Sequence, residues 1–271
     1  MAIDLHIHTT ASDGSLSPRE VVTKAKLLGL SVISITDHDT TDAISEAISV
    51  GALLGVEVVP GIEINTEDGA EEVHILGYLI DHNTPWLIEF LSNLKRKREE
   101  RIYKIAEKLS TLNISIDPEE VLKGVRGATP GRPHVAKVMV DRGYVRSIAE
   151  AFEKYLGNQA PAYVPRHHTT PKEAIRVISE VGGVPVLAHP IYLKDQGLIP
   201  KLIELGLKGI ECWHGEQNGS VSFQYLGLAK GYGLVVTGGS DYHGDYYEPR
   251  RTMGHPPVQD EIYHQLLSFR T

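Results

Sequence analysis

Short apolar segments alternate with segments of helical periodicity at both ends of this 271-residue chain, and this alternation constrains its fold most strongly. The apolar segments predict strands and the segments between them predict helices. Strands and helices that alternate over short connections favour an α/β fold with a parallel sheet and right-handed crossovers. Seven strands are predicted, at residues 3–8, 30–36, 56–63, 73–79, 184–188, 209–213 and 234–238.

Helix signals follow most of these strands. Ser17 and Glu20 predict a capping box with Pro18 in the first turn, and Gly29 and Gly55 end the first two helices. Seven strands with these helices favour a (β/α) barrel of seven rather than eight units. The predicted helices outside the middle of the chain cover residues 17–28, 41–54, 171–181, 199–205, 220–230 and 258–269.

The middle of the chain has a different pattern. Helical periodicity dominates it, and we find no convincing strand pattern. We therefore expect a barrel domain formed by residues 1–84 and 161–271, with residues 85–160 inserted as a helical subdomain over the barrel mouth. The helices expected there cover residues 86–112, 118–123, 133–142 and 147–156.

Histidines and carboxylates gather where the predicted strands end. In barrels of this type the functional groups lie at the carboxyl ends of the strands. A single His-x-His pair is weak evidence, but six of the seven strands end in, or lead directly to, such a residue. The candidate metal ligands are His6, His8, Asp13, His38, Glu63, His74, His189, Asp241 and His243.

The chemistry of these nine side chains indicates the kind of metal. Imidazole and carboxylate ligands without thiolate suit Mn²⁺, Fe²⁺ or Zn²⁺ better than Ca²⁺ or Mg²⁺ alone. Nine ligands exceed the needs of one ion and would serve two or three. Clustered ions deprotonate a bridging water at neutral pH and neutralise phosphate oxygens, which indicates phosphoester hydrolysis by a metal-bridging hydroxide.

Composition limits the partners and the location. The net charge of −8 disfavours binding to long duplex nucleic acid. The single cysteine, Cys212, excludes an intramolecular disulfide and favours a reducing compartment. With no signal-peptide pattern and no long apolar run, we expect a cytoplasmic protein with no membrane association and no obligatory protein partner.

These residues together resemble the polymerase and histidinol phosphatase (PHP) superfamily, over nearly the whole chain. The resemblance implies a distorted seven-stranded barrel and a site for three divalent ions. One ion would take His6, His8, Glu63 and Asp241. A second would share Glu63 and take His74 and His189. The third would take Asp13, His38 and His243.

A short motif in the helical segment resembles one branch of this superfamily in particular. Gly131-Arg132-Pro133-His134 is similar to an element of the branch that contains nucleoside 3′,5′-bisphosphate phosphatases and 5′-to-3′ exonucleases acting on short RNA. Arg132 and His134 are the candidate residues for binding the substrate phosphate, because a guanidinium can form paired hydrogen bonds with it. A helix start with an ordinary surface arginine is the alternative interpretation.

Several other residues have open roles. Asp37 and Asp39 are expected to orient His38 rather than to bind a metal ion. His214 fits either a pocket wall or an ordinary loop. The tyrosines at positions 242, 246 and 247 fit base stacking or a loop equally well, and His167 and His168 suit the surface.

The favoured function is hydrolysis of the 3′-phosphate of nucleoside 3′,5′-bisphosphates, 5′-to-3′ cleavage of short oligonucleotides, or both. The expected partner is therefore a small phosphorylated substrate, either a nucleotide or a short oligonucleotide. Histidinol phosphate is the alternative substrate. A metal-binding regulatory module without activity is the alternative of another class, and the complete set of ligand-type residues disfavours it.

Overall fold

The computed structural model of this chain describes residues 2–69, 71–125, 130–165, 169–217, 219–245 and 251–269. The chain forms two compact units. The first contains Met1–Ile88 and His168–Thr271, and the second contains Glu89–His167. None of the described helices combines the length and apolar character that crossing a bilayer requires.

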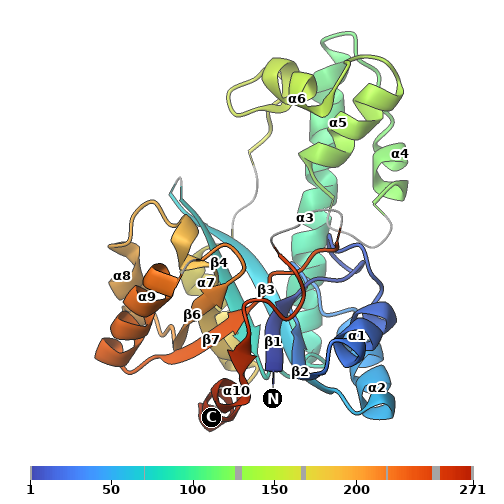
Figure 1. Cartoon of the computed structure of the whole chain (residues 1–271). Coiled ribbons are helices and arrows are strands. Elements are labelled where there is room, and N and C mark those ends of the chain that lie inside the picture. The colour runs from blue at the N-terminus through green and yellow to red at the C-terminus, as the bar shows by residue number, and fades with distance from the viewer. Residues whose placement is uncertain are drawn as a thin grey trace. The chain divides into compact units, whose positions relative to one another are not determined.

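The first unit is built on one sheet of eight strands in the order β7-β6-β5-β4-β3-β2-β1-β8 (Figure 1). Just beyond β7, at the other edge of this sheet, the chain meets β1, where the amide of His8 donates to the carbonyl of Tyr242 at 3.0 Å. This contact nearly closes the sheet into the distorted barrel that the sequence predicts. The strands are β1 (Ala2–Ile7), β2 (Leu30–Ile35), β3 (Glu57–Asp68), β4 (Glu71–Tyr78), β5 (Val184–Leu187), β6 (Gly209–His214), β7 (Val235–Gly239) and β8 (Val258–Gln259).

All seven predicted strands are present, but the sheet is mixed rather than parallel. β4 runs antiparallel to both β3 and β5, whereas β1, β2 and β3 pair in parallel, as do β5, β6 and β7. The reason lies between Asp68 and Glu71, where the connection is too short to carry a crossover and only a hairpin can form.

The eighth strand, β8, is not predicted from the sequence. Val258 and Gln259 pair antiparallel with Ile3 and Ala2 of β1, where the sequence predicts the start of the last helix. The helix begins at Asp260 instead. A two-residue strand is too short to produce a detectable alternation of polar and apolar residues.

Helices cover the sheet of the first unit. A cluster of buried side chains, including Val21, Ala47 and Ile33, packs α1 and α2 against β2, and Ser17 and Glu20 form the predicted capping box. The helices are α1 (Pro18–Leu27), α2 (Ile44–Leu54), α7 (Pro171–Glu180), α8 (Leu198–Glu204), α9 (Gly219–Tyr232) and α10 (Asp260–Ser268), with one 3-10 turn, η2 (Pro190–Tyr192).

The second unit contains helices but no strand among its described residues, and it has its own core. Ile105 and Leu109 of its long helix pack in one cluster with Val135 and Met139. Its elements are α3 (Pro85–Ser110), which begins before the boundary of the unit, α4 (Pro118–Lys123), α5 (Arg132–Asp141), α6 (Ile148–Ala151) and the π-helix η1 (Phe152–Leu156).

Candidate metal centre

The nine candidate ligands all lie in the first unit, at or just beyond the strands that were expected to carry them. The donor atoms of eight of them, all except His189, form three overlapping groups, and within each group the atoms lie within 4.8 Å of one another. The groups are His6, His8, Glu63 and Asp241; His8, Asp13, His38 and His243; and His38, Glu63 and His74.

Glu63 lies at the centre of the site and is completely buried. Burial by itself would raise the pKa of this carboxyl, but the histidines around it, with His38 and His6 foremost, hold the pKa well below its usual range. Its Oε2 lies 3.2 Å from His6 Nε2, His8 Nε2 and His38 Nδ1, and its Oε1 lies 2.8 Å from His74 Nδ1 and 3.0 Å from His189 Nε2.

The first group lies deepest. His6 and His8 point to the same side of β1 because side chains two residues apart on a strand share a face. Their Nε2 atoms lie 3.3 and 3.1 Å from Oδ1 of Asp241. All four members of this group are buried, so an ion held here would be shielded from solvent.

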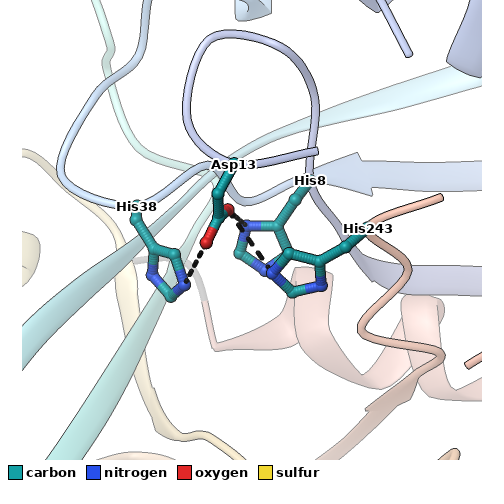
Figure 2. A group of neighbouring side chains, drawn as sticks. All are labelled: His8, Asp13, His38 and His243. Carbon is teal, nitrogen blue, oxygen red and sulfur yellow. Dashed lines mark ion pairs between the residues drawn. The ribbon is translucent and has the colours of Figure 1, made fainter. Parts of the chain in front are cut away.

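The second group lies nearer the surface, because the side chain of Asp13 is 52% exposed. In Figure 2 this carboxylate points between His38 on one side and the paired rings of His8 and His243 on the other. Its oxygens lie 3.4 Å from His243 Nε2 and 3.7 Å from both His8 Nδ1 and His38 Nε2. The structure thus groups His8 with the three residues that the resemblance implies for this ion.

The third group differs more from the ligand set that the resemblance implies. His38 joins Glu63 and His74 here, where the resemblance places His189. His189 nevertheless adjoins the group, with its ring centroid 5.0 Å from that of His74 and its Nε2 beside Oε1 of Glu63.

The state of His8 fits a metal ligand. The residue is fully buried, and neither ring nitrogen forms a well-aligned hydrogen bond with a described residue, although Nε2 lies 3.1 Å from Asp241 Oδ1 and 3.2 Å from Glu63 Oε2. Burial would lower its pKa, but the nearby carboxylates of Asp241 and Glu63 raise it to about 10. Its Nε2 faces Glu63 and Asp241 and its Nδ1 faces Asp13, so the ring lies between the first and second groups.

Two further buried residues lie beside the groups. The sequence left the role of His214 open and did not indicate Glu211. His214, the last residue of β6, is not in a loop but fully buried, with its Nε2 3.2 Å from Oδ2 of Asp241. Glu211 is buried on the same strand and lies 3.0 Å from Nδ1 of His6. The sequence signal for Glu211 was a carboxylate within an apolar strand, because a buried carboxylate needs hydrogen-bond donors around it.

Two further contacts near Asp241 have no local sequence signal. Asp4 is buried on the same face of β1 as His6 and accepts hydrogen bonds from the amide and hydroxyl of Ser240 at 2.9 and 2.6 Å. The guanidinium of Arg251 pairs with Oδ2 of Asp241. The Asp4 contact joins segments far apart in the chain, whereas Arg251 lies ten residues beyond Asp241.

The two aspartates beside His38 accept hydrogen bonds from a loop and from β3. Asp37 accepts hydrogen bonds from the amide and hydroxyl of Thr9 and from the hydroxyl of Ser12, at 2.6–2.7 Å. Asp39 accepts from the backbone and side-chain nitrogens of Asn65 at 3.1 and 2.9 Å. That they orient His38 stays a prediction.

Arg132 and His134 lie in the second unit, at the start of α5. Nη1 of Arg132 donates to the Leu156 carbonyl and to Oδ1 of Asn158, both at 3.0 Å. Its guanidinium also lies 5.5 Å from the ring centroids of Phe152 and Tyr163. These contacts give this arginine a packing role, and its role in binding phosphate stays a prediction.

Tyr242 and Cys212 are both buried packing residues. The ring of Tyr242 is 1% exposed and its hydroxyl donates to Asp245, so it is not placed to stack a base. Burial raises the pKa of Cys212 to about 12, as expected for an unreactive thiol. Residues 167, 168, 246 and 247 lie outside the described residues.

Comparison with known proteins reveals one family and several relatives. A family model described as "PHP domain" matches residues 4–157. The 5′-3′ exoribonuclease Rnm of Escherichia coli is 36% identical over 250 residues, which cover 89% of this chain and 84% of the relative. A 3′,5′-nucleoside bisphosphate phosphatase of Chromobacterium violaceum is 31% identical over 97% of this chain and 96% of its own length.

A solved structure agrees with these matches. It is a candidate metal-dependent phosphoesterase of Bifidobacterium adolescentis, and it superposes with a TM-score of 0.83 at 30% identity. The superposition covers 99% of this chain and 96% of that structure, so the likeness extends over nearly the full length of both chains.

Proposed function

The chain belongs to the PHP domain family and is a metal-dependent phosphoesterase, and on this premise we propose that it removes the 3′-phosphate of nucleoside 3′,5′-bisphosphates. The same site would release nucleotides from the 5′ end of short oligonucleotides, since both reactions replace an ester oxygen on phosphorus by water. The grouping of eight ligand-type side chains around Glu63 is the observation that carries the proposal.

The site would hold three divalent ions, Mn²⁺, Fe²⁺ or Zn²⁺, through imidazole and carboxylate donors. The first group would hold one ion and the group around Asp13 a second, while Glu63, His74 and His189, joined by His38, would hold the third. Ions bound there would supply charge neutralisation for the phosphate and a lowered pKa for water.

The exposure of the side chains indicates where the substrate enters. His6 and Glu63 are fully buried, whereas Asp13 is half exposed and His243 is 15% exposed. The phosphate would therefore approach from the side of Asp13 and His243, and the buried histidines would stay out of contact with solvent.

Arg132 and His134 would anchor a substrate phosphate from the helical segment, residues 85–160, which we propose acts as an insertion over the barrel mouth. Both hydrogen bonds of Arg132 to described residues use Nη1, which leaves the remaining guanidinium nitrogens suited to an anion. The packing of its guanidinium on two aromatic rings would limit the conformations it can take.

The test is a comparison of substrates. Purified protein supplied with Mn²⁺ is expected to release phosphate from adenosine 3′,5′-bisphosphate much faster than from histidinol phosphate, with a 5′-phosphorylated short RNA as the third substrate. Chelation of the metal should abolish all three reactions. Faster release from histidinol phosphate would overturn the nucleotide assignment, and no turnover of any ester would favour a regulatory module.

A further inference from the structure

Glu211 is a buried carboxylate that the proposed chemistry leaves without a role. It lies on β6 between the apolar residues Ile210 and Cys212, and its side chain is fully buried. A carboxylate in such a place is stable only where donors surround it. Its partners therefore indicate why it is there.

Each oxygen of Glu211 has a separate partner in the site. Oε1 lies 3.0 Å from Nδ1 of His6, and Oε2 accepts the backbone amide of His189 at 2.7 Å. One side chain thus connects a candidate ligand on β1 with another that follows β5.

The contact with His6 determines which nitrogen of that ring is available to a metal. An imidazole that donates its Nδ1 proton to a carboxylate keeps a lone pair on Nε2. Nε2 of His6 lies 3.2 Å from Glu63 and 3.3 Å from Asp241, among the donor atoms of the first group. Glu211 therefore directs the metal-binding nitrogen toward that group.

The contact with His189 holds an unusual backbone. This residue has φ 25° and ψ 61°, in the left-handed region that side chains other than glycine rarely adopt. Such conformations persist where surrounding contacts fix them. The hydrogen bond from its amide to Glu211 is such a contact, and it places the ring with Nε2 3.0 Å from Glu63.

We infer that Glu211 is a positioning residue for the metal centre. It fixes the tautomer of His6 and the backbone of His189, and so couples the ligands of two neighbouring ions. This inference rests on the proposed metal centre and adds to it a residue that does not itself touch metal or substrate.

The variant Glu211→Gln tests this because it keeps the shape and removes one acceptor. Both partners are donors, and an amide has only one oxygen to accept them. If its NH₂ group faces His6, that ring has to accept at Nδ1 and carry its proton on Nε2, where a metal would bind. If it faces His189, two N–H groups oppose each other.

Metal binding is the first measurement. Glu211→Gln is expected to bind Mn²⁺ roughly 10–100-fold more weakly than wild type, as lost partners of metal ligands generally cause. Glu211→Asp, which keeps both acceptors on a shorter side chain, should recover part of the affinity. The control Glu57→Gln alters an exposed glutamate near the start of β3 and should bind like wild type.

A second measurement, made without metal, separates this inference from the proposed function. Hydrogen exchange at the His189 amide should be faster in Glu211→Gln than in wild type, as followed by NMR. Unchanged exchange and unchanged Mn²⁺ affinity in a folded Glu211→Gln protein would overturn the role of Glu211. Faster exchange with no Mn²⁺ binding by wild type would instead overturn the metal centre.

Discussion

Asp241 and His189 both adopt left-handed backbone conformations, with φ of 53° and 25°. A buried carboxylate lies against the backbone at each of these points. Asp4 accepts the amide of Ser240 beside Asp241, and Glu211 accepts the amide of His189. Strained backbone at functional positions needs such fixed partners, and here both are acids inside the barrel.

A second prediction at the level of single residues concerns Arg132. Arg132→Ala is expected to raise KM for the nucleotide about 10–100-fold with a smaller change in kcat, because a lost hydrogen bond to a charged group costs about 1.5–3 kcal/mol. The measurement is steady-state kinetics on the 3′,5′-bisphosphate, with thermal unfolding recorded in parallel.

The matched control for this prediction lies at the other end of the same helix. Arg142 follows α5 and pairs with Glu120, so Arg142→Ala should leave KM unchanged. If Arg132→Ala lowers the unfolding temperature but leaves KM at the wild-type value, the arginine is a packing residue and the phosphate assignment is wrong.

The sequence could predict where the candidate ligands lie, because strand ends and residue chemistry are both local properties. It could not predict the contacts that surround them. Glu211 and His6 are far apart in the chain, as are Asp4 and Ser240, and only the closure of the barrel brings each pair together. The orientation of a ring depends on such contacts, which no local pattern encodes.

The carboxyl ends of β7 and β1 approach each other unusually closely. A side-chain carbon on Gly239 would collide with the Cβ and backbone nitrogen of His6. Glycine at this position therefore lets the strand ends come together, and with them the ligands of the deepest group.

Gly239→Ala is accordingly expected to destabilise the protein by roughly 1–3 kcal/mol, as overpacking of a core does, and to weaken metal binding. Gly227→Ala in α9, where an added carbon meets nothing within 4 Å, should instead stabilise it by about 0.4–1 kcal/mol. Denaturant unfolding measures both changes. Equal stability of the two variants would show that the close approach is not rigid.

At the scale of elements, the alternation of residues predicts strands but not their direction. Parallel and antiparallel strands share the same period of two, so β4 could be located from its sequence but not oriented. The hairpin between Asp68 and Glu71 decides the direction, and β3 and β4 both extend further toward it than their apolar residues indicate. Polar residues beyond the sheet's core conceal such extensions.

The whole molecule links metal binding to pH. Without ions, neighbouring carboxylates outweigh burial and raise the pKa of His8 to about 10 and of His74 to about 9. These ion pairs stabilise the metal-free protein fully below pH about 6.5, and this stabilisation is lost as the pH rises toward 9–10. An ion, in contrast, binds only after the rings lose their protons.

The gap in unfolding temperature between metal-loaded and metal-free protein should therefore widen with rising pH. At pH 8, Mn²⁺ at 100 times its Kd is expected to raise Tm by roughly 5–10 °C, and the rise at pH 6 for the same total Mn²⁺ should be smaller. Differential scanning calorimetry with and without chelator measures this gap. An equal gap at both pH values would contradict proton competition at these histidines.

The pairing of β8 with β1 joins two strands that are far apart in the chain. Ala2 pairs with Gln259, so this edge of β1 is covered only once β8 has docked beside it. An exposed strand edge is open to pairing with other chains. Loss of the short β8 strand would therefore uncover an edge that favours aggregation.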